Sequence, residues 1–253
     1  MRPIDIWLTD EELAGIYSAS YWNNIEEEKK KDWWIVDGNY QRCLDYLDQS
    51  GLIHEYREAE KAVMAYPRSS IKMADIAAGI GWVSALLSKL PNVSEVHAVE
   101  LSQHRLGELF EHSIRMMDGD AMKIHRHLGS FYDLRFDNNS LDIVFLSQAF
   151  HHADRPLSLL VECDRVLKAG GCLIMIGEHF ISAKQIARRF FRTLIKERRL
   201  ATTFYELFPP DQSSGDHYYR VSDYKVMFRL MNYKLEHHFL RNGNLMLIAC
   251  KPL

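Results

Sequence analysis

Two carboxylates and two glycines stand in the order that a nucleotide-binding loop requires. Asp75 closes a short apolar run, Gly79 and Gly81 follow, and Glu100 ends the next apolar run 25 positions after Asp75. Glycines let the backbone turn sharply and approach a ligand without a Cβ in the way. The first acid can accept hydrogen bonds from a cationic ligand group or from the loop's amides, and the second can take both hydroxyls of a ribose. The set predicts a site for an adenosine-containing cofactor. A glycine turn between two strand-end acids, with no ligand, is the alternative interpretation.

A second group of polar residues follows a later apolar run. Ser147 and Gln148 end that run, and His151 and His152 come directly after it. In an open parallel sheet, ligands bind beyond the carboxyl ends of the strands, so these side chains are expected at the same edge as the glycine loop. A histidine there is a candidate general base, and either His151 or His152 is predicted to serve. One ring is expected to face the ligand site while the other caps the following turn together with Asp154, and a structural role is the alternative.

A lone carboxylate, Asp216, stands out shortly before the last expected helix. It lies in the polar and aromatic stretch 214–220. We single it out as a candidate functional carboxylate, and an ordinary loop and helix cap is the alternative.

The composition restricts the classes of protein that the chain can form. It has 253 residues, of which 47% are apolar and 26% charged, as in globular proteins with a core. A net charge of −3 gives no electrostatic reason to expect a nucleic-acid partner. Acids near the N-terminus and the lack of a run of about 18 apolar residues argue against a signal peptide or a membrane span, so a cytoplasmic location is expected.

The cysteines show no spacing typical of a metal site. No Cys-x-x-Cys pair occurs, so no metal is predicted, and the cysteines are interpreted as buried thiols in a reducing compartment; they are Cys43, Cys163, Cys172 and Cys250.

Strand and helix patterns alternate from residue 69 onward, which is typical of a parallel α/β sheet. Strands are expected near 71–76, 95–100, 122–128, 141–147 and 171–177. Helices are expected near 82–90, 103–117, 156–168 and 221–231. Asn242-Gly243 favours a tight turn, so residues 234–251 are predicted to form an antiparallel hairpin.

Residues 1–68 are helical in pattern and are predicted to form a lid or extension. Thr9 and Glu12 make a capping box, 26–31 is interpreted as a solvated helix face, and one helix is expected over 40–65. Aromatic residues here either pack this appendage onto the core or cover cofactor and substrate; they are Tyr21, Trp22, Trp33, Trp34 and Tyr40.

Residues 181–220 are too long for a plain connection and are expected to form an inserted helical cover segment. A helical apolar stripe lies within them, and basic residues repeat every four positions on another face. The simple interpretation is a solvated face of a packed helix, and the alternative is attraction to an anionic substrate or membrane surface. The basic residues are Lys184, Arg188, Arg192 and Lys196.

These motifs, taken in order, resemble those of class I S-adenosylmethionine-dependent methyltransferases, within the broad group that acts on small molecules. The resemblance covers residues 71–178 and extends more loosely to the C-terminus. It rests on Asp75-Ile76-Ala77-Ala78-Gly79-Ile80-Gly81, Val99-Glu100, Phe136 to Val144, Ser147 to His152, and Arg165 to Gly171. It implies a Rossmann-like, doubly wound, mostly parallel seven-stranded sheet whose last strand is antiparallel.

The resemblance also implies roles for individual residues in binding S-adenosylmethionine. The loop would cradle the methionine part through Asp75, Ala77, Ala78, Gly79 and Gly81. Glu100 would hold the ribose, with Leu101 beside it among the cofactor-binding residues. The segment flanking the adenine would be Gly129, Ser130 and Phe131, and the pair beneath the sulfonium would be Ser147 and Gln148.

Three residues depart from the family's usual pattern. Ala77 replaces the first loop glycine, Ser130 replaces a common aspartate on the adenine side, and Ala169 replaces a common proline. Ala77 is tolerable where its φ is negative, since an alanine Cβ crowds the left-handed region. Ser130 offers an uncharged acceptor, which predicts weaker cofactor binding, and Ala169 has no effect on the chemistry.

Two other functions remain open at this point. Residues 79–84 nearly spell a nicotinamide-binding fingerprint, but Asp75 would then lie close to a pyrophosphate, which is unfavourable. A non-catalytic member of the fold that acts as an interaction module is the other alternative. We predict methyl transfer to a small-molecule acceptor, with the acceptor atom and the oligomeric state left open.

Overall fold

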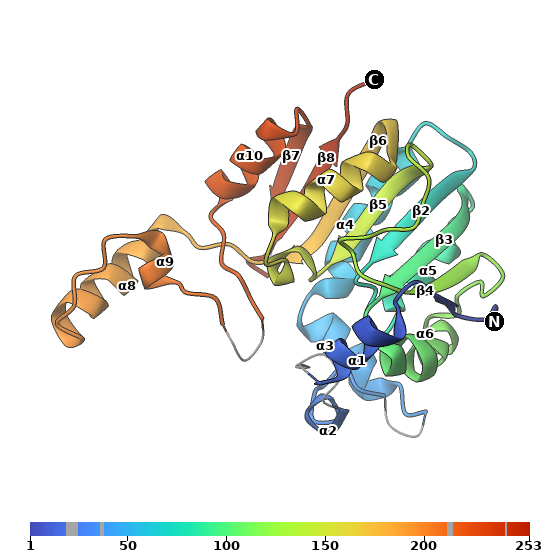
Figure 1. Ribbon diagram of the computed structural model, residues 1–253, viewed down its shortest axis with the longest axis horizontal. Helices are drawn as coiled ribbons and strands as arrows, with labels where there is room; N and C mark the ends of the chain where they lie inside the picture. The colour runs from blue at the N-terminus through green and yellow to red at the C-terminus, as the bar shows by residue number, and fades with distance from the viewer. Residues whose placement is uncertain (19–24, 36–37, 212–214, 241) are drawn as a thin grey trace.

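A mixed sheet lies at the centre of the computed structural model, which describes residues 1–253 except 19–24, 36–37, 212–214 and 241. The strand order is β1-β4-β3-β2-β5-β6-β8-β7, with helices on both faces (Figure 1). The strands are β1 (Asp5–Ile6), β2 (Ile71–Ile76), β3 (Val93–Glu100), β4 (Ile124–Leu128), β5 (Leu141–Ser147), β6 (Leu167–Glu178), β7 (Lys234–Phe239) and β8 (Leu245–Cys250).

Alternating apolar side chains bury both faces of this sheet. In β5, Ile143 and Phe145 pack on one face while Val144 and Leu146 pack on the other, as the two-residue period of a strand requires. The first face is covered by α3 (Gln41–Gln49), α4 (Leu52–Ala65), α5 (Trp82–Ser88) and α6 (Phe110–Met117), which follows the π-helical turn η2 (Arg105–Leu109). The second is covered by α7 (Pro156–Val166) and α10 (Val221–Leu230).

The remaining helices lie at the carboxyl edge of the sheet or beyond it. They are α1 (Asp10–Ser18), α2 (Ile25–Glu28), the 3-10 turn η3 (Phe150–His152), α8 (Ala183–Lys196) and α9 (Phe204–Leu207). In the described part of the chain, no helix combines the length and the apolar character needed to cross a membrane.

The predicted fold class is confirmed. β2 to β6 pair in parallel, β8 runs antiparallel to β6, and β7 runs antiparallel to β8. All seven expected strands are present, but β1 adds an eighth, which pairs with β4 through Asp5 and His127. This strand has two residues, too few for a two-residue period to be recognised in the sequence.

Two predictions about local structure are wrong. The single helix expected over 40–65 is two helices, because Gly51 between them has a φ of +80°, outside the right-handed helical region. Cys172 and Cys250 form a disulfide, whereas the sequence predicted four free thiols. They lie 78 residues apart but directly opposite each other on antiparallel β6 and β8. Cys43 and Cys163 are buried free thiols, as expected.

Candidate active site

A cavity of about 1270 Å³ lies at the carboxyl edge of the parallel strands. Its lining comes from the loop after β2, from the ends of β3, β4 and β5, and from residues before α3. β2 has β3 as its neighbour on one side and β5 on the other, so the strand order reverses direction at β2. Open parallel sheets bind ligands at such a switch point. The lining includes Ala77, Ala78, Gly79, Glu100, Leu101, Gly129, Ser130, Phe131, Ser147, Gln148, His151 and His152.

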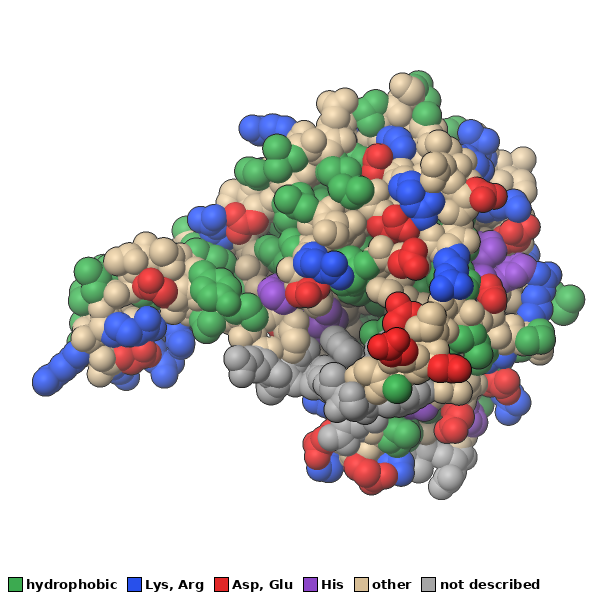
Figure 2. All heavy atoms as spheres, in the orientation of Figure 1, with side chains coloured by type: hydrophobic (Ala, Val, Ile, Leu, Met, Phe, Trp, Pro, Cys, Tyr) green, Lys and Arg blue, Asp and Glu red, His purple; other side chains and the backbone are tan. Residues whose placement is uncertain are grey.

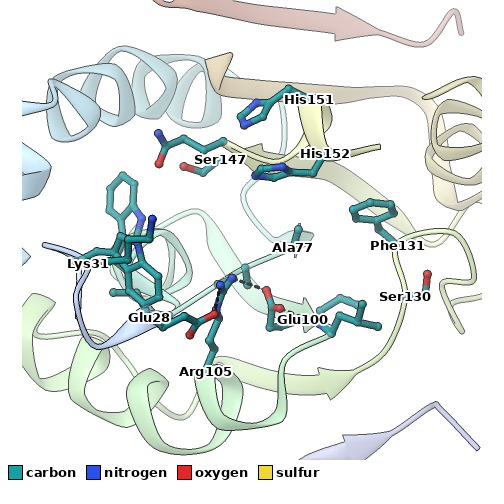
Figure 3. Close-up of a pocket in the computed structure, with 18 of the residues that line it drawn as sticks. Glu28, Lys31, Ala77, Glu100, Arg105, Ser130, Phe131, Ser147, His151 and His152 are labelled. Carbon is teal, nitrogen blue, oxygen red and sulfur yellow. Dashed lines mark hydrogen bonds and ion pairs between the residues drawn. The ribbon is translucent and has the colours of Figure 1, made fainter. Parts of the chain in front are cut away.

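Twelve of the fourteen predicted site residues therefore line one space, and Asp75 and Gly81 do not. Figure 3 shows His151 and His152 on one side of it and Glu28 with Arg105 on the other. Ala77 and Glu100 lie between them.

Glu100 fixes the glycine loop through its carboxylate. One oxygen accepts the Gly79 N–H at 2.7 Å, and the other accepts the N–H groups of Leu101 and Ser102, each at 2.9 Å. The side chain is buried. A carboxylate offers about four acceptor sites, so three amides leave one for a ribose hydroxyl without rearrangement.

The loop turns through three residues of positive φ. Gly79 has a φ of +56°, and a Cβ there would meet nothing within 4 Å. Gly81 has a φ of +82°, and a Cβ there would lie 2.2 Å from the Phe110 ring, so only glycine lets α5 begin against α6. Ala77 has a φ of +53°. An alanine is tolerated without strain only where φ is negative. Ala77 does not meet this condition, so it carries backbone strain.

Asp75 lies under the loop rather than in the cavity. Its carboxylate is buried and accepts a hydrogen bond from Ser84 Oγ at 2.6 Å. Its Oδ1 has no hydrogen-bond partner among the described residues. Burial raises the pKa of Asp75 to about 7, against the opposing effect of the Ser84 hydrogen bond, and the Glu100 charge raises it further.

Ser147 and Gln148 form the floor of the cavity at the end of β5. Gln148 has a φ of +51°, and its N–H donates to the Ile176 carbonyl at 2.8 Å. Its side chain shares a hydrogen bond with Tyr46, which comes from α3. Ser147 Oγ is buried without a hydrogen-bond partner in the described structure. An orphaned hydroxyl in a cavity wall is typical of a position where a ligand supplies the missing partner.

The predicted adenine side is formed where β4 ends. A Cβ on Gly129 would lie 2.6 Å from the Trp7 ring, so glycine is required for this close packing. Ser130 Oγ accepts the Tyr132 N–H at 3.1 Å, which engages the hydroxyl in its own turn. Phe131 also faces the cavity (Figure 3).

His151 is held by a buried carboxylate. Its Nδ1 lies 3.0 Å from Oε2 of Glu178, which is fully buried at the end of β6. Glu178 also accepts the N–H groups of Ala149, Phe150 and His151. Burial alone would lower the pKa of His151, but the attraction of Glu178 outweighs it and raises that pKa. The pair locks the turn after β5.

His152 pairs with Asp216 instead. Its Nδ1 lies 3.2 Å from an Asp216 oxygen, and both side chains are partly exposed. His151, His152 and Asp216 offer potential ligand atoms within 4.8 Å of one another, a donor set that transition metals accept. The sequence singled out each of these residues separately but gave no sign that the chain brings them together.

The charged run before α3 contributes residues that the sequence analysis missed. The sequence pattern predicts that Glu28 lies on a solvated helix face, and this prediction is wrong, because its side chain is buried. One Glu28 oxygen lies 2.6 Å from His104 Nε2, and the other binds the Arg105 guanidinium. Burial would raise the pKa of Glu28, but these two partners lower it overall. We call Glu28, His104 and Arg105 the lid clamp.

The aromatic residues of the N-terminal segment are divided between two roles. Trp33 lines the cavity and lies against the Arg105 guanidinium, 5.1 Å from ring centroid to carbon. Trp34 is buried in the core, and the partly buried Tyr40 packs against the core. Tyr21 and Trp22 lie outside the described residues, as does Ser214 in the stretch around Asp216.

Comparison with known proteins finds similarity to methyltransferases. Residues 74–175 match a family model described as a methyltransferase domain. An uncharacterized methyltransferase of Schizosaccharomyces pombe is 32% identical over 136 residues, which cover 51% of this chain and 49% of that protein. The matched part of the chain is similar to class I S-adenosylmethionine-dependent methyltransferases, as the sequence motifs predict. This similarity points to S-adenosylmethionine rather than a nicotinamide as the cofactor.

Other methyltransferases extend the comparison. A demethylmenaquinone methyltransferase of Staphylococcus aureus is 28% identical over 146 residues, covering 54% of this chain and 56% of that protein. The chain thus spans about half the length of these relatives. A methyltransferase structure from Aquifex aeolicus is 16% identical with a TM-score of 0.55, covering 85% of this chain and 97% of that one.

A second solved structure also shares the fold. The Bacillus YcgJ protein is 17% identical with a TM-score of 0.59, and the match covers 79% of this chain and 99% of that one. At such low identity these two structures support the methyltransferase fold alone.

Proposed function

We propose that this protein moves a methyl group from S-adenosylmethionine to a small-molecule acceptor with an apolar body. The observation that carries the proposal is one cavity of about 1270 Å³ that joins the Glu100 loop to the His152 side chain. Single ligands commonly fill about 300–1,000 Å³, so this volume suits a cofactor together with an acceptor. Tyr46, Leu47 and Trp33 in the lining suit an apolar body. The Staphylococcus relatives are named for a quinone acceptor.

The residues of the cavity suit the cofactor. Ala77 to Gly79 would hold its methionine part, Glu100 its ribose, and Gly129 to Phe131 its adenine, while Ser147 Oγ supplies an unsatisfied polar group near the expected methyl position. When bound, the cofactor supplies a methyl group already activated on a sulfonium.

The remaining work of the protein is alignment, exclusion of water and proton removal. We assign proton acceptance to His152, because Asp216 can orient its ring and stabilise its positive charge. We assign His151 a positioning role, since Glu178 holds it inside the turn after β5. Residues 1–68 would act as the lid, and 69–253 as the cofactor-binding domain with 181–220 as an insert.

Calorimetric titration with S-adenosylhomocysteine tests the cofactor assignment. Glu100→Ala is expected to weaken binding at least tenfold, because it removes both the ribose acceptor and the brace on the loop. Glu95→Gln is the matched control, since this acid lies on the same strand and pairs with Lys72 away from the cavity. A native protein that does not bind, or an unchanged affinity in Glu100→Ala, would refute the assignment.

Turnover with labelled S-adenosylmethionine and a panel of quinols and phenols tests the reaction. His152→Gln and Asp216→Asn are expected to lower kcat by about 10²–10⁴, the range for a general base. Transfer that chelator abolishes and a divalent metal restores would instead assign the His152 cluster to metal binding. Absence of transfer to any acceptor, with cofactor binding intact, would favour the non-catalytic interaction module.

The partners and the location follow the same proposal. We propose a small-molecule substrate, no nucleic-acid partner and a cytoplasmic location, and we assign no oligomeric state. Binding partners can be measured on the purified chain, and the location by fractionation of cells that contain the protein.

A further inference from the structure

Residues 183–207 form a helical arm that leaves the body of the molecule. The arm comprises α8, α9 and the stretch between them, and Figure 1 shows it projecting to one side, away from the sheet. α8 begins with a capping box at Ser182 and Gln185 and packs on α9. Within α8, Thr193 alone is buried, so this helix is not the packed element that the simple interpretation expected.

The arm carries a strong positive charge on a protein that is slightly negative. It holds two acids, Glu197 and Glu206, and seven basic residues, which gives a net charge of +5 against −3 for the whole chain. The basic residues are Lys184, Arg188, Arg189, Arg192, Lys196, Arg198 and Arg199.

Large apolar side chains are exposed on the same arm. Phe191, Leu194 and Ile195 occupy one stripe of α8 at helical spacing and are 57%, 41% and 71% exposed. Leu200 and Tyr205 are 62% and 66% exposed nearby. Figure 2 shows apolar side chains gathered along the arm, with basic ones toward its outer end. Water disfavours such a stripe, so its clustering points to a surface that covers it.

We propose that the arm docks on an anionic lipid bilayer, with the apolar stripe inserted among the acyl chains and the basic residues at the headgroups. A helix with a basic polar face and Phe and Leu on its other face, but low overall hydrophobicity, is the type that lies in a membrane interface. Each Lys or Arg near an anionic leaflet adds about 1 kcal/mol of attraction. Charge and apolar exposure together select a bilayer over a purely ionic partner such as nucleic acid.

The base of the arm adjoins the acceptor end of the cavity. The Ile181 N–H donates to the Tyr219 carbonyl at 2.8 Å, which joins the outgoing and returning legs of the chain. On the returning leg, the His217 N–H donates to the His151 carbonyl at 2.7 Å, and Asp216 pairs with His152. A docked arm would therefore hold the acceptor end of the cavity close to the bilayer that dissolves an apolar acceptor. This delivery role rests on the proposed function, whereas docking itself does not.

Flotation of the full chain with vesicles tests the docking. We compare neutral phosphatidylcholine vesicles with vesicles that also contain 30 mol % phosphatidylglycerol, at about 50 and 300 mM salt, which differ in screening length. Binding is expected on the anionic vesicles and should weaken at the higher salt. The combined Arg188→Gln, Arg192→Gln and Lys196→Gln variant should bind the anionic vesicles at least tenfold less, since each removed charge is worth about fivefold.

A second variant tests the apolar stripe, and matched variants control for both. Phe191→Ser with Ile195→Ser should also lose at least tenfold in binding. Equally exposed positions elsewhere serve as controls and should bind like the native chain. They are the triple variant Lys61→Gln, Arg115→Gln, Lys234→Gln and the double variant Val161→Ser, Leu230→Ser.

Three results would overturn the proposal. These are no flotation with anionic vesicles, equal flotation with neutral ones, and arm variants that bind like their controls. Sedimentation that converts a dimer to a monomer in Phe191→Ser with Ile195→Ser would assign the stripe to a second copy and overturn it too. Titration with S-adenosylhomocysteine is expected to be unchanged in the arm variants, so failure of docking and failure of the methyltransferase assignment are read separately.

Discussion

Ala77 adopts a left-handed backbone conformation at a position where the family commonly has glycine. Such a φ costs a non-glycine residue about 1–2 kcal/mol, and a glycine would remove this cost. The glycine would itself lose about 0.5–1 kcal/mol, because it gives up more backbone entropy on folding than alanine does. Ala77→Gly is therefore expected to raise the free energy of unfolding by up to about 1 kcal/mol. Urea unfolding of the variant measures this change.

Ala78 provides the comparison. It is not among the residues of positive φ, so Ala78→Gly should destabilise the protein by about 0.5–1 kcal/mol through chain entropy. Equal effects of the two substitutions would show that the backbone of Ala77 is not strained.

Asp75 makes stability depend on pH. In the unfolded chain its pKa is near 3.8, and in the folded protein burial raises that pKa to about 7. The folded state therefore keeps a proton that the unfolded state has lost. The contribution of Asp75 to stability is therefore greatest below pH 3.8, the pKa in the unfolded chain, and is lost as pH rises through 7, the pKa in the folded protein. Because each pKa unit corresponds to about 1.4 kcal/mol, the loss amounts to a few kcal/mol.

Asp75→Asn should remove this dependence. The variant is expected to gain stability over the native protein at pH 8 and much less at pH 4.5, because asparagine carries no charge to bury. Chemical unfolding at both values measures the difference, and Asp48→Asn, at an exposed position, controls for general charge effects. The same difference at both pH values would contradict the assignment.

The sequence predicts which residues meet at the edge of the sheet, but not how each side chain is oriented. Glu100, Gly79 and the His151-His152 pair could be found because strand ends converge at one edge of a parallel sheet. The sequence did not separate Asp75, which turns under the loop, from residues that line the cavity. It also missed the pairing of His152 with Asp216, since the partner arrives on a distant loop.

At the scale of elements, the lid clamp joins the proposed lid to the wall of the cavity. Glu28 on α2 joins His104, just before η2, and Arg105, the first residue of η2, and breaking a buried ion pair typically costs about 3–5 kcal/mol. Glu28→Gln is therefore expected to lower the free energy of unfolding by up to that amount, to speed amide exchange in residues 25–35 and to speed release of S-adenosylhomocysteine.

An exposed neighbour supplies the control for the clamp. Glu26→Gln removes an acid whose side chain is 79% exposed and which pairs with Lys29 on the surface, and such pairs contribute about 0–1 kcal/mol. If both variants exchange and release alike, the clamp does not hold the lid.

The sequence could not separate a solvated acid from a buried one in this run. Glu26, Glu27 and Glu28 are identical in type, and burial of the last depends on residues 76 and 77 positions away. For the arm, too, the sequence leaves the surroundings undetermined. Its amphipathic pattern predicts a helix with an apolar stripe, but it does not predict which surface covers that stripe.

At the scale of the whole molecule, seven strands of the sheet could be predicted from the sequence. The pairing of β1 with β4 and the disulfide between β6 and β8 could not. Apolar runs, helical patterns and the Asn242-Gly243 turn determine seven strands and their directions. The two-residue β1 and the cysteine pair depend on which strands become neighbours. That information lies in tertiary packing rather than in any local pattern.

The Cys172–Cys250 disulfide ties β8 to the parallel sheet. Reduction is expected to lower the free energy of unfolding by about 2–4 kcal/mol, as for disulfides in general. Urea unfolding with and without reductant measures it, and thiol titration after denaturation should find two free thiols, rising to four on reduction. Cys250→Ser should be insensitive to reductant, and four thiols in the unreduced protein would contradict the pairing.

The hydrogen bond between Ile181 and Tyr219 brings the two legs of the chain side by side below residues 183–207. An insertion whose ends meet can be exchanged for a short turn while the sheet and the glycine loop stay in place. The segment that this bond closes contains Asp216, the partner of His152, as well as residues 183–207. One exchange would therefore change the outer surface of the protein and its proposed proton acceptor together.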